Sequence, residues 1–176
     1  MRKLVFILFL VLFACEQENN TSDELNQKWR GKKVSFTDDL EPFVTQANRK
    51  SDSGVKNRTV VAYYDGNCSS CYKELLKWIH VKEDFIEKGY HVDFKFILSG
   101  YNKALVKGYL KQVKFPLEDV FYASKNSFIE KYSFLTEINY EYSSMLLDRN
   151  NKILLIGNPT TSERILKIFT ELVRQD

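Results

Sequence analysis

The sequence has few cysteines, histidines and prolines and little net charge: three, two and three of these residues among 176, with a formal charge of +3. The chain has no second Cys-x-x-Cys pair and its two histidines are badly placed for the first, so it does not supply the four ligands of a structural zinc site. A net charge this close to zero does not indicate the basic surface that nucleic-acid binding requires. No segment repeats at the periods of solenoids or propellers. A hydrophobic content of 44% suits one α/β core, so we expect a single domain.

Long apolar runs are also scarce. Leu4 to Ala14 is unbroken but too short to span a bilayer permanently. It follows Arg2 and Lys3, and this order is typical of an export signal. The run ends in Leu12-Phe13-Ala14-Cys15, which resembles the lipobox of bacterial lipoproteins. That resemblance implies a signal peptide over residues 1–14 and a diacylglycerol on Cys15; an ordinary secretory signal is the alternative.

The segment after Cys15 is almost wholly polar as far as Arg30, so we expect residues 15–30 to form a flexible tether and residues 31–176 the domain. Removal of the signal leaves 24 basic and 23 acidic side chains, a net charge of +1. Glu16 after the cysteine resembles the sorting signal of outer-membrane lipoproteins. We therefore expect a periplasm-facing protein of the cell envelope, held to the outer membrane by lipid, with no nucleic-acid partner.

A strand, a turn and a helix follow one another in the middle of the chain. Thr59 to Tyr64 is β-branched and aromatic without polar alternation, which is typical of a strand buried on both faces. Asp65-Gly66-Asn67 breaks it, and Cys68 opens an amphipathic helix that ends near Lys88. His91 to Leu98 is a second strand, so the unit is a parallel βαβ crossover.

Further elements are predicted on both sides of this unit. A capping box at Thr160 and Glu163 is expected to start the last helix. The other expected elements are short strands at Lys33–Phe36 and Val120–Ala123, helices at Asn102–Lys114 and Ser127–Tyr132, and an antiparallel hairpin of Ser144–Asp148 with Lys152–Ile156.

The motif Cys68-Ser69-Ser70-Cys71 carries the chemistry. At a helix N-terminus, backbone amides and the helix dipole stabilise the first sulfur as a thiolate, and the second sulfur lies one turn away. Cys68 is then the nucleophile and Cys71 the resolving thiol. A disulfide between residues three apart closes almost no chain loop, so a structural disulfide is a poor explanation of the motif.

Four other interpretations of the motif compete with this one. His80 lies nine residues after Cys71, about 13 Å along the helix and on its opposite side, so the two cannot share a metal. Covalent haem attachment needs a histidine where Tyr72 stands. We expect no metal and no cofactor. A metal site shared between chains and an inactive relic of a redox motif stay open.

The segment from Val60 to Leu75, with Glu74 three residues after the second cysteine, resembles the active-site strand and helix of membrane-tethered thioredoxin-like proteins of the TlpA/redoxin type. Met145 to Ile153 is similar to the closing hairpin of that family, and Asn102 to Tyr132 fills the place of its inserted αβ segment. The resemblance implies an α/β thioredoxin-like fold, a central mixed β-sheet flanked by helices, with an αβ insertion before the closing β-hairpin.

Two positions depart from that family. Its cis-proline beside the active site is replaced by Tyr142, followed by Ser143; we expect both to face the dithiol and the Glu141–Tyr142 peptide to be trans. Ala62 stands where thioredoxins have a buried acid. Asp65 is the nearest acid upstream of Cys68, and its position favours a solvated turn former.

The sequence thus predicts a thiol-disulfide oxidoreductase that acts on protein or small-molecule thiols and disulfides. The supporting residues are expected to be Ser69, Ser70, Asp65, Glu74, Tyr142 and Ser143. A lipid-anchored binding module without catalysis, which uses the surface around Tyr142 and Tyr63, is the alternative.

Overall fold

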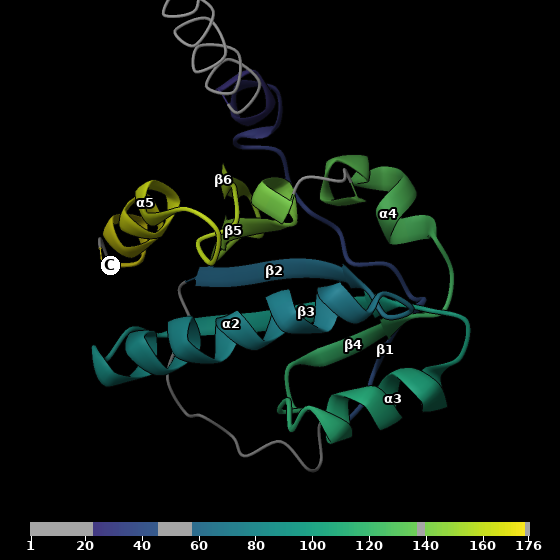
Figure 1. The fold of residues 1–176 in the computed structure, drawn as a ribbon. Coiled ribbons are helices and arrows are strands. Elements are labelled where there is room, and N and C mark those ends of the chain that lie inside the picture. The colour runs from purple at the N-terminus through teal and green to yellow at the C-terminus, as the bar shows by residue number, and fades with distance from the viewer. Residues whose placement is uncertain (1–22, 46–57, 137–139, 175–176) are drawn as a thin grey trace, which may run out of the picture.

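The computed structural model describes residues 23–45, 58–136 and 140–174. A mixed six-stranded sheet lies at its centre, with the strand order β1-β4-β3-β2-β5-β6, and helices cover both faces (Figure 1). The strands are β1 (Leu40–Pro42), β2 (Arg58–Asp65), β3 (Val92–Ser99), β4 (Val120–Ala123), β5 (Ser144–Asp148) and β6 (Ile153–Ile156).

Four helices follow the strands in the order expected of a βαβ unit with an inserted segment. They are α2 (Ser69–Glu87), α3 (Lys103–Gln112), α4 (Ser127–Lys131) and α5 (Glu163–Arg174). Two short 3₁₀ turns, η2 (Ser133–Thr136) and η3 (Tyr140–Tyr142), lead from α4 into β5. The predicted fold class is confirmed: the sheet is mixed, and α3, β4 and α4 form the αβ insertion before the hairpin.

Strand β2 lies in the middle of the sheet. It pairs in parallel with β3 over eight residues and antiparallel with β5 over five. Val60, Val61 and Ala62 are all fully buried, as expected of a strand covered on both faces. The loop at the carboxyl end of β2 therefore has a rigid base, and the Cys68 motif follows this loop at the start of α2.

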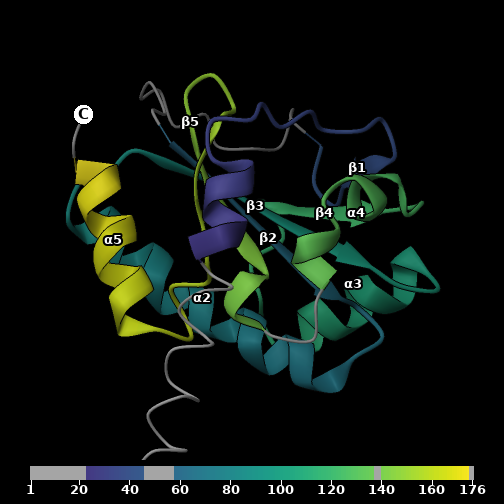
Figure 2. The ribbon, with the colours of Figure 1, turned by 90° about the horizontal axis from the view of Figure 1, so that it is seen from above.

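Alternate residues of β2 belong to two separate hydrophobic clusters. Val60, Ala62 and Tyr64 pack with α2, α3 and α5, where Trp78, Leu110 and Phe169 are fully buried. Val61 packs on the other face with α4, η2 and the hairpin. Figure 2 shows the same sheet from above, with α4 and α5 at different ends of the strand order.

The prediction of a flexible tether is wrong for residues 23–30. Residues 23–29 form a helix, whose Leu25 and Trp29 pack against the second cluster. Asn26 donates from Nδ2 to the Ile156 carbonyl (3.0 Å), and its Oδ1 accepts from the Ile156 backbone N–H (2.7 Å). Leu25 and Trp29 lie one helical turn apart on one side of this helix. Their packing and the two hydrogen bonds of Asn26 to β6 order the segment, although its polar composition predicts disorder.

Two smaller predictions also need correction. Lys33–Phe36 forms no strand: Lys33 makes one isolated antiparallel bridge with Lys152 at the edge of β6. The cap of α5 is not Thr160, whose hydroxyl donates to Asn158 Oδ1 (2.8 Å). Instead the Ser162 hydroxyl lies 3.4 Å from the Ile165 backbone nitrogen and accepts from it. A serine two residues nearer the helix supplies the same cap geometry.

Within the part of the chain that the structure describes, no helix is long and apolar enough to cross a membrane. The predicted signal peptide and Cys15 lie outside the described residues.

Candidate functional site

The Cys68-Ser69-Ser70-Cys71 motif lies where β2 ends and α2 begins. The Asp65 carboxylate accepts from the Asn67 backbone N–H (2.9 Å), and the Asp65 carbonyl accepts from the Cys68 N–H (3.2 Å). Gly66 donates its N–H to the Ser99 carbonyl at the end of β3 (2.9 Å). This tight turn makes Cys68 the N-cap of α2, so the first sulfur is at the helix N-terminus, as predicted.

The two cysteines lie in different environments. Both are free thiols; Cys68 is partly exposed, whereas Cys71 is 7% exposed and belongs to the core cluster. Hydrogen bonds from Cys71 and from Ser70, whose Oγ lies 3.0 Å from the Cys68 sulfur, lower the pKa of Cys68 to about 7. Burial and the neighbouring Cys68 raise the pKa of Cys71 to about 11. At neutral pH about half of Cys68 is thiolate, while Cys71 keeps its proton.

Tyr140, in η3, completes the site from a segment 70 residues further along the chain. Its hydroxyl oxygen lies 3.6 Å from Cys71 Sγ, 4.0 Å from Cys68 Sγ and 3.2 Å from Ser70 Oγ. The bond with Ser70 favours its ionised form, but the bond with Cys71 and burial outweigh it and raise the pKa of Tyr140 to about 12. The phenol is therefore a neutral hydrogen-bonding group beside both sulfurs.

Ser143 holds the Tyr140 loop against the sheet. Its carbonyl accepts from the Tyr63 N–H (2.9 Å), and its hydroxyl donates to the Tyr140 carbonyl (2.8 Å). The same hydroxyl accepts from Asn158 Nδ2 (3.1 Å). Ser143 and Asn158 are both buried, at 4% and 0% exposed. A buried hydrogen-bonded network of this kind fixes the geometry of the loop, so Ser143 positions Tyr140.

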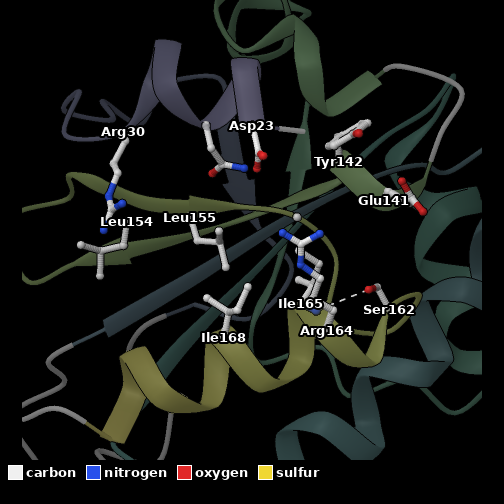
Figure 3. A pocket seen from close by; sticks show the side chains of 12 residues that line it. Asp23, Arg30, Glu141, Tyr142, Leu154, Leu155, Ser162, Arg164, Ile165 and Ile168 are labelled. Atoms are coloured by element: carbon white, nitrogen blue, oxygen red, sulfur yellow. Dashed lines mark hydrogen bonds between the residues drawn. The ribbon is translucent and has the colours of Figure 1, made fainter. Parts of the chain in front are cut away.

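Tyr142 does not face the dithiol, contrary to the expectation from the sequence. Its side chain is buried in the second hydrophobic cluster. With Glu141 it lines a pocket of about 390 Å³ between residues 23–30, β6 and α5 (Figure 3). Ile165 and Ile168 of α5 form part of the pocket wall. The described residues contain no cis peptide bond, so the Glu141–Tyr142 peptide is trans as expected.

The side chains of the remaining predicted supporting residues form local contacts or are exposed. Ser69 is exposed on the first turn of α2. Glu74 forms an ion pair with Lys77 (2.7 Å) on the same helix. Asp65 is exposed and bonds its own turn, in agreement with a turn former. Ala62 is fully buried in β2. The structure therefore brings the hydroxyl groups of Ser70 and Tyr140 to the two sulfurs, whereas the side chains of Asp65, Glu74 and Tyr142 have other partners.

Sequence reasoning missed Tyr140. The sequence has two tyrosines at this place, in Tyr140-Glu141-Tyr142. Counting back from the hairpin selected the second of them, and the first was not considered. The 3₁₀ turn η3 directs the first tyrosine to the cysteines and the second into the core. In the described ranges, no group of three or more His, Cys, Asp or Glu side chains could hold a metal ion.

Comparison with known proteins agrees with this architecture. No protein-family model matches the chain, and no curated protein matches it. Several solved structures do. A thioredoxin-like protein from Parabacteroides distasonis is 11% identical, covering 80% of this chain and 94% of that chain with a TM-score of 0.56.

Two others carry descriptions of a reaction. A proposed thiol-disulfide oxidoreductase from Bacteroides vulgatus is 18% identical over 66% of this chain and 74% of its own, with a TM-score of 0.55. A proposed thiol:disulfide interchange protein DsbE from Chlorobium tepidum is 16% identical over 82% and 97%, with a TM-score of 0.53. At these identities the likeness concerns the backbone. The chain has a thioredoxin-like fold, in which the dithiol lies between the central strand and the helix that follows it.

Proposed function

We propose that the protein is a thiol-disulfide oxidoreductase that works through Cys68 and Cys71. The observation that carries the proposal is the asymmetry of the dithiol: a partly exposed sulfur with a pKa of about 7 beside a buried one with a pKa of about 11. A structural disulfide has no need of that difference, whereas exchange requires one attacking thiolate and one protected resolving thiol. The thioredoxin-like neighbours described as oxidoreductases support it.

The reaction has two displacement steps. The Cys68 thiolate attacks a substrate disulfide, a mixed disulfide forms, and one substrate sulfur leaves as a thiolate that solvent protonates. Cys71 then loses its proton to solvent and attacks the Cys68 sulfur. The second substrate sulfur leaves with the bonding electrons, and Cys68 and Cys71 are joined. The substrate gains two electrons and the protein loses two; the reverse sequence oxidises a substrate dithiol.

Ser70 and Tyr140 assist both steps in this proposal. The Ser70 hydroxyl stabilises the Cys68 thiolate before attack. The Tyr140 hydroxyl lies nearer to Cys71, and a hydrogen bond donated to that sulfur stabilises the thiolate that must form in the second step. Because Ala62 provides no acid or base behind the dithiol, the Tyr140 hydroxyl is the polar group best placed to stabilise the Cys71 thiolate.

We further propose that residues 1–14 are a lipoprotein signal peptide and that lipid on Cys15 holds the domain in the cell envelope, facing the periplasm, at the outer membrane. The apolar run and the lipobox-like sequence support this. Fractionation of cells that express the wild type and Cys15→Ala tests it. Membrane-bound wild type and uncleaved or soluble variant are expected, and wholly soluble wild type contradicts it.

One experiment separates exchange from a non-catalytic binding module. The pre-reduced domain is mixed with the neutral disulfide bis(2-hydroxyethyl) disulfide, and the Cys68 and Cys71 thiols are trapped by alkylation over time. Conversion to the Cys68–Cys71 disulfide with release of two equivalents of mercaptoethanol is the expected result. Cysteines that stay reduced, or that react no faster than free cysteine, favour the binding module.

A further inference from the structure

A buried amide lies behind the turn that carries Tyr140. Asn158 lies two residues after the end of β6 and is 0% exposed, although asparagine is usually found at the surface. Burial of an amide lowers stability unless its polar atoms are bonded, and a leucine of similar size would avoid that loss. What Asn158 contributes must therefore come from the bonds that it makes.

All four polar groups of Asn158 are bonded. Its side-chain oxygen Oδ1 accepts from the Thr160 backbone N–H (3.0 Å) and from the Thr160 hydroxyl (2.8 Å). Its carbonyl accepts from the Thr161 backbone N–H (3.2 Å). On the other side, its backbone N–H donates to the Glu141 carbonyl (2.6 Å), and its Nδ2 donates to the Ser143 hydroxyl (3.1 Å). Asn158 thus joins the turn before α5 to η3.

These bonds matter because η3 has little to hold its own shape. A 3₁₀ turn of three residues closes few bonds of its own, and the one from the Ser143 N–H to the Tyr140 carbonyl is long, at 3.3 Å. The Ser143 hydroxyl supplies a shorter bond to the same carbonyl (2.8 Å). The next carbonyl, that of Glu141, accepts from Asn158. The direction of the Tyr140 side chain therefore depends on Ser143 and Asn158 together.

The orientation of the Asn158 amide decides where the proton of the Ser143 hydroxyl goes. A backbone N–H can only donate, so the Asn158 atom that faces the Thr160 N–H is the oxygen, and the NH₂ group faces Ser143. The NH₂ group donates to the Ser143 oxygen and cannot accept from it. The one proton of that hydroxyl is therefore left for the Tyr140 carbonyl. An aspartate of the same shape would present an acceptor and draw this proton away from Tyr140.

The same network reaches the strand and the helix of the dithiol. Burial raises the pKa of Tyr64 in β2, and side-chain hydrogen bonds with three residues oppose that rise: Trp78, Ser143 and Asn158. The indole N–H of Trp78 in α2 donates to the Tyr64 hydroxyl (2.7 Å). The network therefore fixes η3 relative to β2 and to α2, the helix that holds Cys71.

We propose that Asn158 is a positioning residue for the resolving step: it directs the Ser143 hydroxyl to the Tyr140 carbonyl and so holds the Tyr140 hydroxyl beside Cys71. This rests on the proposed function and assigns one of its two steps to a side chain that acts through two others. When the Cys71 thiolate forms, the Tyr140 hydroxyl is already in place to donate to it. Attack by Cys68 depends little on this relay, because hydrogen bonds from Cys71 and Ser70 contribute most to the low pKa of Cys68.

Stopped-flow kinetics with dithiobis(2-nitrobenzoate) measures the two steps separately. The pre-reduced domain is mixed with one equivalent, and the first coloured thiolate released reports attack, whereas the second reports resolution. Asn158→Asp keeps the shape of the side chain and replaces the donor by an acceptor. Ser143→Ala removes the middle of the relay without burying a charge, so it carries the test if Asn158→Asp fails to fold. Ser144→Ala is the matched control, because Ser144 is also fully buried but its hydroxyl donates to the Gly157 carbonyl (2.8 Å).

Asn158→Asp and Ser143→Ala are expected to slow the second phase about three- to tenfold and to change the first by less than about twofold. Ser144→Ala should leave both phases unchanged, although it should lower the midpoint of urea unfolding. Tyr140→Phe combined with Asn158→Asp should be no slower than Tyr140→Phe alone, because the relay ends at that hydroxyl. Equal losses in both phases, the same loss in Ser144→Ala, or effects that multiply in the double variant would overturn the proposal.

A measurement on Cys71 alone separates this proposal from the proposed function. Burial and the neighbouring Cys68 raise the pKa of Cys71, and the hydrogen bond with Tyr140 opposes them. Labelling of Cys71 by iodoacetamide is followed against pH in the Cys68→Ser background. Its midpoint should move upward with Asn158→Asp or Ser143→Ala and stay in place with the control variant. If this shift occurs and the wild type does not exchange, only the proposed function fails; if exchange occurs and the midpoint does not move, only the role of Asn158 fails.

Discussion

Two segments meet at the dithiol, and they are built in different ways. The first, from β2 through the turn to α2, is continuous in sequence and holds both cysteines. Its shape follows from local rules: a buried strand, a turn closed by Asp65, and a helix capped at Cys68. The second is η3 and the start of β5, which brings Tyr140 to the sulfurs through hydrogen bonds of Ser143 with Tyr63 and Asn158.

In the proposed exchange reaction, the two segments act on different sulfurs. The local segment lowers the pKa of Cys68, since Cys71 and Ser70 are the largest causes of that low pKa. The distant segment acts mainly on Cys71, whose sulfur is nearer to the Tyr140 hydroxyl. Changes in the first segment should therefore alter attack on the substrate, and changes in the second should alter resolution of the mixed disulfide.

Removal of either cysteine has the largest expected effect. Cys68→Ser should lower the rate of exchange at least about a thousandfold, because a hydroxyl is not ionised at neutral pH. Cys71→Ser should still attack and should accumulate the mixed disulfide on Cys68, which mass spectrometry detects. If Cys68→Ser forms a mixed disulfide on Cys71 at the wild-type rate, the assignment of the nucleophile is reversed.

Labelling against pH compares the two sulfurs directly. The rate of iodoacetamide labelling at Cys68 should rise with pH around a midpoint of about 7, because its thiolate forms there. Cys71 should label slowly until near pH 11. At pH 7 the ratio of rates should be about a thousandfold. Peptide mapping after brief labelling measures both, and equal rates would contradict the geometry of the turn.

Gly66→Ala tests the close packing of the turn in the first segment. A Cβ at this position would lie 2.3 Å from the Ser99 carbonyl oxygen and 2.8 Å from a methyl group of Val106. We expect a loss of about 1–3 kcal/mol in the free energy of unfolding, measured by urea denaturation. The matched control is Gly108→Ala in α3, where the new methyl meets nothing within 4 Å. It should be stabilised by about 0.5–1 kcal/mol, and a similar loss in both variants would show that the turn is not tightly packed.

Tyr140→Phe probes the second segment and should have the smallest effect. Loss of one hydrogen bond to the forming Cys71 thiolate should slow resolution of the mixed disulfide about three- to tenfold. The labelling midpoint of Cys68 should move only slightly upward, because Tyr140 is the last of the causes that lower its pKa. Stopped-flow kinetics with a chromogenic disulfide separates the two steps. Tyr142→Phe, two residues away, is the control and should leave both steps unchanged.

Several expectations from the sequence failed where a contact between distant segments decided the outcome. Residues 23–30 looked like a tether because most are polar, yet Leu25, Trp29 and the paired amide of Asn26 attach them to β6 and the second cluster. Lys33 makes only a single bridge, with Lys152 about 120 residues away, and the first strand of the described residues begins at Leu40. Local composition does not report a partner that lies 130 residues away.

The sequence by itself determined the strand, the turn and the helix of the dithiol, and the order of strands and helices that makes the fold recognisable. These follow from patterns of neighbouring residues: an apolar run, an Asx turn and a helical stripe. Only the tertiary structure decided that Tyr140 and not Tyr142 meets the sulfurs, because a single turn of 3₁₀ helix sets which side chain points to the site. It also decided the large difference in pKa, since burial of Cys71 depends on the packing of α2 against β2.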